Sequence, residues 1–122
     1  MASTELQGIV RFRFHEGAVE EFKRLSQQCM EIVRTRDTGT LQYDTFFNED
    51  ETECIVIERF RDSDALIRHG ENLAHLMEAI LATGSVSGEL LGDPSPEVRS
   101  QLAPGGPVQL FTPWLRMEPP RG

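Results

Sequence analysis

The spacing of hydrophobic residues changes along the chain, and this change restricts the folds that the chain can adopt. Across residues 6–14 apolar and polar side chains alternate, as in a strand with one buried face. Across residues 18–36 the apolar side chains recur every three or four positions, as on one side of a helix. Continued to residue 91, these two periods predict the order strand, helix, strand, strand, helix, strand.

The later elements have recognisable boundaries. Gly39 follows the first helix and is expected to end it in a left-handed conformation. A polar connection between residues 41–47 and 54–60 is typical of a hairpin. Asp62 or Ser63 is expected to cap a second helix, and residues 85–91 form a weaker fourth strand. This order is the ferredoxin-like β-α-β-β-α-β arrangement of the α+β class, in which both helices cover one face of an antiparallel sheet.

That arrangement leaves the second face of the sheet without a cover. A chain of 122 residues corresponds to one domain and buries only a modest core. Because an apolar sheet face must be buried against something, a second copy of the same sheet is the simplest cover. We therefore expect a homodimer.

The chain divides into a core of residues 1–92 and an extension of residues 93–122. In the extension, Ser95 and Pro96 predict a short helix, followed by an extended segment at residues 108–112. The extension is expected to pack on the same domain or on the partner subunit. Trp114, the only tryptophan, is expected either to cap a cavity or to fill a groove on the partner.

Charge and composition exclude several partners and sites. The chain has 12 Lys and Arg against 20 Asp and Glu, a net charge of −8, which argues against nucleic acid and anionic membranes. It shows no secretory signal and no apolar run long enough to span a membrane. Cys29 and Cys54 lack the spacing of zinc ligands, so no metal is expected. These features favour a cytoplasmic protein.

The centre of the chain carries a recognisable pattern. Gly39 and Tyr43 precede the acidic hairpin, and Glu58-Arg59-Phe60 and an Ala-Leu helix with His69 follow it. This pattern resembles the antibiotic biosynthesis monooxygenase family over roughly residues 6–92. The resemblance implies a dimeric α+β barrel with a ligand cavity between sheet and helices in each subunit. Family members include cofactor-independent oxygenases of phenols and quinols, and also haem-degrading enzymes and a sugar isomerase, so the fold does not settle the reaction.

His69 and Asn72 are the candidate catalytic residues. His69 shares the inward stripe of its helix with Leu66 and Leu73, and a histidine can accept a phenolic proton near neutral pH. The alternative is a structural histidine. Asn72, three residues later, could steady an oxyanion or lie at the surface. His75 departs from the family spacing and is expected to face solvent.

Glu58 lies among apolar neighbours on its strand, so it needs a partner or a purpose. An ion pair with Arg11 or Arg13 that fixes the dimer is the favoured interpretation, and a place in the pocket is the alternative. Tyr43 is either a hydrogen-bond donor to the ligand or a core residue. The ligand pocket is expected to comprise Phe12, Tyr43, Glu58, Phe60, Leu73 and Met77.

Three functions remain open. The first is a cofactor-independent monooxygenase that oxidises a small phenol or quinol with dioxygen, without flavin or metal. The second is a non-catalytic module that binds a small aromatic ligand or only assembles, and the third is a cofactor-free isomerase or decarboxylase. Haem degradation is disfavoured, since Val10 and Phe60 stand where haem-degrading relatives carry Asn and Trp.

Overall fold

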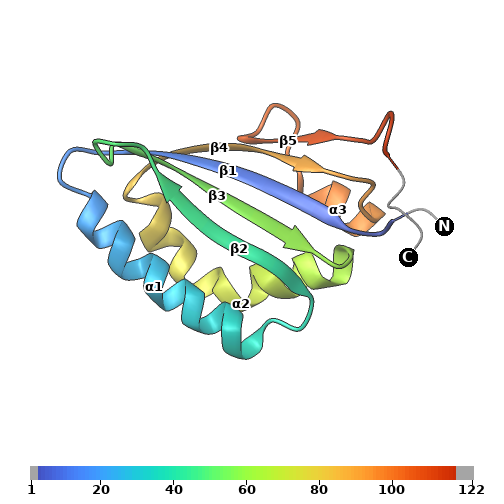
Figure 1. Cartoon of the computed structure of the whole chain (residues 1–122), viewed down its shortest axis with the longest axis horizontal. Helices are drawn as coiled ribbons and strands as arrows, with labels where there is room; N and C mark the ends of the chain where they lie inside the picture. The colour runs from blue at the N-terminus through green and yellow to red at the C-terminus, as the bar shows by residue number, and fades with distance from the viewer. Residues whose placement is uncertain (1–2, 118–122) are drawn as a thin grey trace.

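The computed structural model describes residues 3–117. Strands and helices follow one another in the predicted order, and a short helix and a fifth strand come after them (Figure 1). This confirms the α+β ferredoxin-like fold. The elements are β1 Leu6–Phe14, α1 Val19–Arg36, β2 Thr40–Phe47, β3 Glu53–Phe60, α2 Ser63–Leu81, β4 Gly84–Leu91, α3 Pro96–Gln101 and β5 Val108–Phe111.

The strands form one sheet in the order β2-β3-β1-β4-β5. Strands β1 to β4 pair with one another in antiparallel orientation, as expected. Strand β5 adds to the edge of β4 in parallel, so the sheet is mixed and has five strands rather than four. Helices α1 and α2 lie together on one side of the sheet (Figure 1).

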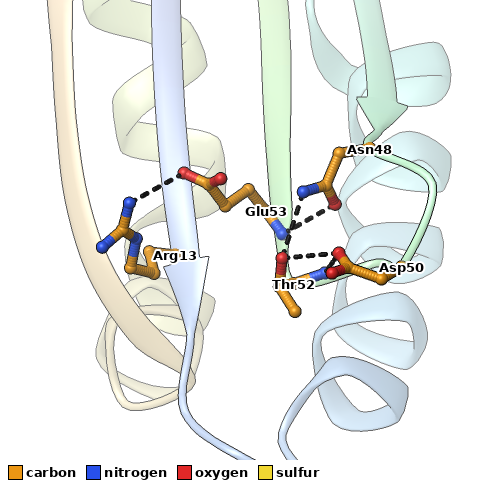
Figure 2. A network of polar contacts seen from close by, with 5 residues as sticks. All are labelled: Arg13, Asn48, Asp50, Thr52 and Glu53. Carbon is orange, nitrogen blue, oxygen red and sulfur yellow. Dashed lines mark hydrogen bonds and ion pairs between the residues drawn. The ribbon is translucent and has the colours of Figure 1, made fainter.

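The hairpin between β2 and β3 is closed by polar side chains (Figure 2). The Asn48 carboxamide oxygen accepts from the Glu53 backbone N–H at 3.0 Å, and the Asp50 carboxylate accepts from the Thr52 backbone N–H at 3.1 Å. These bonds fix the register of the hairpin, in which Tyr43 lies opposite Glu58. A slip of one residue would turn Tyr43 to the other face of the sheet.

The core consists of two clusters. The larger one fills the space between the helices and the middle of the sheet and includes Phe12, Phe22, Leu25, Cys29, Val56 and Leu73. The smaller one joins Leu6 of β1 and Leu90 of β4 to Val98 of α3. Since Val98 is only 1% exposed, α3 is anchored to the same domain as the rest of the fold.

Trp114, near the end of the extension, does not have the first of its two expected positions, at the mouth of the cavity. Trp114 is 89% exposed and Leu115 is 83% exposed. Trp114 is not among the residues that line the cavity between sheet and helices, so it does not cap the cavity of its own subunit. Residues 118–122, which belong to the same extension, lie outside the described part of the chain.

The face of the sheet opposite the helices carries exposed apolar side chains near its β2 edge. Phe46 of β2 and Ile55 of β3 are paired neighbours there and are 57% and 39% exposed. Ion pairs lie beside them on the neighbouring strands, among them that of Arg11, the cross-strand neighbour of Ile55, with Glu89 at 2.7 Å. The face is therefore an apolar patch with a charged rim.

Among residues 3–117, no helix combines the length and the apolar character that crossing a lipid bilayer requires.

Strands β1 and β4 approach each other closely at Gly88. A Cβ atom there would lie 2.3 Å from the carbonyl oxygen of Ile9, so any side chain would force the strands apart. We expect Gly88→Ala to lower the free energy of unfolding by about 2–3 kcal/mol, as overpacking does elsewhere. Urea denaturation measures this change. Ser87→Ala, at an exposed neighbouring position, is the control and should leave the midpoint nearly unchanged.

Candidate functional site

A cavity of about 370 Å³ lies between the sheet and helices α1 and α2. Its wall is mostly apolar and comes from all five strands and from helices α1 and α2. Its polar side chains are few, namely Ser26, Tyr43, Thr45, Glu58 and His69. An apolar pocket with a small number of polar groups is the usual form of a small-molecule site.

His69 is buried on the inner side of α2, with 7% of its surface exposed. Its ring packs against Tyr43 and Phe60, with ring centroids 5.3 and 5.0 Å away. Its Nδ1 lies 2.7 Å from Oδ2 of Asp37. The ring is therefore held in one orientation, with Nδ1–H donating to the carboxylate.

Asp37 follows the last residue of α1 in an extended conformation. Its carboxylate accepts hydrogen bonds from Thr40 Oγ1 at 2.6 Å and Asn72 Nδ2 at 2.8 Å in addition to His69. Burial opposes the charged form, but the hydrogen bonds from Thr40, Asn72 and His69 outweigh it, so the pKa of Asp37 lies below its ordinary value. Asp37 is thus a buried carboxylate with three donors.

The loop that carries Asp37 lies close to α2 because of Gly39. A Cβ atom at Gly39 would lie 2.5 Å from the Cβ of Ala65, so a side chain would push the loop away from α2. The expectation of a left-handed cap is wrong, because Gly39 does not have a positive φ angle. The glycine is required by close packing rather than by the end of the helix.

Glu58 lies on the other side of the imidazole. Its Oε1 is 3.6 Å from Nε2 of His69, an ion-pair distance that is longer than a hydrogen bond. Gly8 faces it from β1, where a Cβ atom would lie 3.1 Å from Oε2, so this glycine leaves room for the carboxylate. The expected pairing of Glu58 with Arg11 or Arg13 is wrong, since these arginines pair with Glu89 and Glu53.

The two carboxylates determine the charge of the imidazole. Burial lowers the pKa of His69, but the neighbouring Glu58 and Asp37 raise it by more, so the pKa lies above its ordinary value of 6.5. At a given pH a larger fraction of His69 is therefore protonated than of a free imidazole. A protonated imidazole donates from both ring nitrogens and accepts no proton.

Tyr43 completes the polar cluster from β2. Burial raises the pKa of its hydroxyl, and the nearby Cys29 thiol and Glu58 carboxylate raise it further. The hydroxyl therefore stays protonated at physiological pH and can donate a hydrogen bond to a ligand oxygen.

The structure brings most of the predicted site residues to the cavity. Phe12, Tyr43, Glu58, His69, Leu73 and Met77 line it. Phe60 does not, because it is completely buried and packs against His69. Asn72 does not line it either, and its amide donates to Asp37 instead of facing a ligand. His75 is exposed, as expected.

Sequence reasoning missed two parts of the site. Asp37 was not singled out as a site residue, and no local pattern marks it as a partner of His69. Pro107 and Val108 of the extension also line the cavity, because β5 brings them to the edge of the sheet. Within residues 3–117, no cluster of three or more His, Cys, Asp or Glu side chains is arranged to hold a metal ion.

The sequence matches a known protein family over the part of the chain that carries the site. The model of the family described as antibiotic biosynthesis monooxygenase matches residues 8–77, which is more than half of the chain. The chain belongs to this family. The match spans β1 to most of α2 and thus includes Asp37, Tyr43, Glu58 and His69. A search of curated protein sequences finds no significant match.

Solved structures share the fold of this family member. MupZ from Pseudomonas fluorescens is 22% identical with a TM-score of 0.77, over 98% of this chain and 92% of MupZ. Rv0793 from Mycobacterium tuberculosis is 20% identical with a TM-score of 0.66, over 75% of this chain and 96% of its own. SnoaB from Streptomyces nogalater, a cofactor-independent oxygenase, is 21% identical with a TM-score of 0.61, over 72% of this chain and 91% of SnoaB. Of these three, MupZ is aligned over the extension as well as the core.

The position of His69 between two carboxylates leads to a prediction about its protonation. Glu58→Gln removes a negative charge from the Nε2 side, so the pKa of His69 should fall relative to the wild type. Proton–carbon NMR titration of the three histidines measures this change. His15 and His75 do not line the cavity, so they are the internal controls, and the substitution should not alter their resonances.

The same shift predicts how stability depends on pH. Because the pKa of folded His69 is raised, its charged form stabilises the wild type fully below the unfolded value of about 6.5. This contribution is lost as the pH rises through the folded pKa. Urea denaturation across this range should therefore show a larger decline for the wild type than for Glu58→Gln, and equal slopes would contradict the assignment.

Proposed function

We propose that this protein is a cofactor-independent oxygenase that binds a small phenol or quinol in the cavity and deprotonates it for reaction with dioxygen. The observation that carries the proposal is the grouping of Tyr43, Glu58 and His69 on the wall of an otherwise apolar cavity. A phenol has the matching form, with an apolar ring and one polar group. The similarity in fold to SnoaB, named a cofactor-independent oxygenase, is consistent with it.

In this proposal Glu58 is the base and His69 is the proton donor, which reverses the role first expected for His69. The raised pKa of His69 means that more of it is already protonated than of a free imidazole, and the protonated ring has no site left to accept a proton. Glu58 is a carboxylate on the cavity wall, with 17% of its side chain exposed. Protonated His69 and the Tyr43 hydroxyl then stabilise the phenolate oxygen by hydrogen bonds.

Asp37 and Asn72 act through His69. Asp37 fixes the orientation of the imidazole and favours its charged form, and Asn72 and Thr40 hold Asp37 in place. We therefore propose that Asn72 is a positioning residue rather than an oxyanion donor. This role accounts for its place behind the cavity wall.

The proposed reaction balances with dioxygen as the only co-reactant. A phenolate ring carbon that is ortho or para to the oxygen and carries hydrogen forms a bond to dioxygen, and the resulting peroxide takes up a proton from His69. Loss of the hydrogen on that carbon and cleavage of the O–O bond then give a quinone and water. One oxygen atom stays in the product, and the other leaves as water with the proton that His69 supplies.

Oxygen uptake tests the reaction and the residue roles together. With a panel of hydroquinones and polycyclic phenols and no added cofactor, the wild type should consume oxygen faster than autoxidation. Glu58→Gln should lower kcat about 100-fold or more, because it removes the general base. Asn72→Ala should lower kcat less and shift the basic limb of the pH profile, which reports deprotonation of His69, since Asn72 acts on His69 through Asp37.

Two results of this assay would contradict the proposal. Uptake that is unchanged in Glu58→Gln would remove Glu58 from the mechanism. No uptake above autoxidation with any compound, by a folded protein that binds the phenols, would exclude the oxygenase reaction for this ligand class. Ser87→Ala is the matched control, as it changes an exposed residue outside the cavity.

One observation favours a second candidate, a cofactor-free isomerase. Glu58 and protonated His69 place a base and an acid only 3.6 Å apart, a pair that can move a proton between two atoms of a substrate without oxygen. Conversion of substrate under anaerobic conditions, followed by NMR in D2O, distinguishes the two. Solvent deuterium appears in the product only if proton transfer alone is catalysed.

We also propose that the apolar patch around Phe46 and Ile55 is the interface of a homodimer. The patch lies on the face of the sheet that no helix covers, and a second copy of the same face matches it in apolar character. Its charged rim, with arginine and glutamate of both signs, suits a two-fold arrangement.

A charge in the middle of this patch should separate the subunits. We expect the wild type to sediment as a dimer and Ile55→Glu as a folded monomer, because the interface would have to bury two unpaired carboxylates. Gln27→Glu adds the same charge on exposed helix α1 and should remain dimeric. A wild type that sediments as a monomer at micromolar concentration would contradict the proposal.

A further inference from the structure

Gly70 is an unexpected residue for the interior of a long helix. Helix α2 runs without interruption over Ser63–Leu81, and Gly70 does not have a positive φ angle. Glycine in such a place is less stable than alanine. Neither the backbone conformation nor the course of the helix therefore explains its presence.

Packing does not explain it either. A Cβ atom built on Gly70 would have no heavy atom within 4 Å outside the local backbone, in contrast to Gly39 and Gly88, where neighbouring atoms leave no room. Gly70 lines the cavity next to His69, and it is exposed to solvent. The missing side chain thus leaves open space at the rim of the cavity, beside the polar cluster.

Two further exposed residues continue this rim along the helix. Met77 and Leu81 also line the cavity, and they are 37% and 44% exposed. They follow Gly70 by seven and eleven positions, so all three lie on one side of α2 over a length of about 16 Å. An apolar surface therefore begins at the gap over Gly70 and extends to the end of the helix.

We propose that Gly70 determines which ligands the cavity accepts. Without a side chain there, the part of the ligand remote from its reacting oxygen passes over α2 beside His69 and lies along Met77 and Leu81. The ligand class is thus a hydroxyl compound with a long apolar substituent, rather than a single unsubstituted ring. This inference rests on the proposed function for the hydroxyl group, and it adds the substituent and the residue that admits it.

Binding of two phenols tests the inference without any reaction. Titration calorimetry with 4-ethylphenol and 4-octylphenol compares a ligand that fits within the cavity with one that must extend out of it. The wild type should bind 4-octylphenol more tightly, since each methylene buried on Met77 and Leu81 strengthens binding up to roughly fourfold. Gly70→Leu should lower the affinity for 4-octylphenol at least about tenfold. It should change the affinity for 4-ethylphenol less than about threefold, because the new side chain fills only the gap.

Two further variants serve as controls. Ala79→Leu introduces the same side chain at an exposed position of α2 that does not line the cavity and lies on the opposite side of the helix from Gly70 and Met77, and it should bind both phenols as the wild type does. Gly70→Ala should melt at the same temperature as the wild type or a few degrees higher. It should lower the affinity for 4-octylphenol, but by less than Gly70→Leu does. This variant provides the test if Gly70→Leu does not fold.

The outcomes separate this inference from the reaction. The inference would be overturned if Gly70→Leu lost affinity for both phenols equally or for neither. It would also be overturned if the wild type did not bind 4-octylphenol more tightly than 4-ethylphenol. If Gly70→Leu selectively lost affinity for 4-octylphenol while the wild type consumed no oxygen, the inference would be supported and the oxygenase reaction rejected. Oxygen uptake with short quinols, without a preference for the long phenol, would reject the inference alone.

Discussion

The contact between His69 and Asp37 joins the two helices at the site, and the rest of the polar cluster depends on it. Asp37 stands at the end of α1 and His69 in the first half of α2, so the 2.7 Å contact spans 32 positions of sequence. It fixes the imidazole in the one orientation that points Nε2 at Glu58 on the sheet. If Asp37 were displaced, His69 would lose the partner that sets both its tautomer and its charge.

A carboxylate buried to this extent is stable only when donors surround it. Asp37 is almost fully shielded, with 2% of its side chain exposed, and removal of a donor would leave a buried charge that is costly by several kcal/mol. Three donors, one from the start of β2 and two from α2, prevent this. The close approach at Gly39 is what makes them converge, because it brings the loop after α1 against Ala65 of α2. Packing and electrostatics are therefore linked at this loop.

The parts of the protein that sequence could predict are those that repeat. Alternation in β1 and β3 placed Phe12 and Glu58 on the inner face, and helical spacing placed His69 and Leu73 on the inner stripe of α2. Asp37 belongs to no repeating element, and its partners Thr40, His69 and Asn72 are known only once the helices are packed. The extended segment at residues 108–112 was foreseen, but a short strand carries no signal for its partner, so its parallel pairing with β4 and its contribution to the cavity were not.

In the proposed reaction, the charge of the cluster favours Glu58 over His69 as the base. Asp37, protonated His69 and Glu58 together carry one net negative charge, and an added phenolate would raise this to two in a largely apolar space. Transfer of the phenolic proton to Glu58 avoids that increase, since one anion replaces the other beside the same imidazolium. The transfer also frees the Nε2–H of His69 from the 3.6 Å ion pair, so that it can donate to the new oxyanion. The looseness of that ion pair is therefore useful, because the imidazolium exchanges one partner for another without first breaking a strong hydrogen bond.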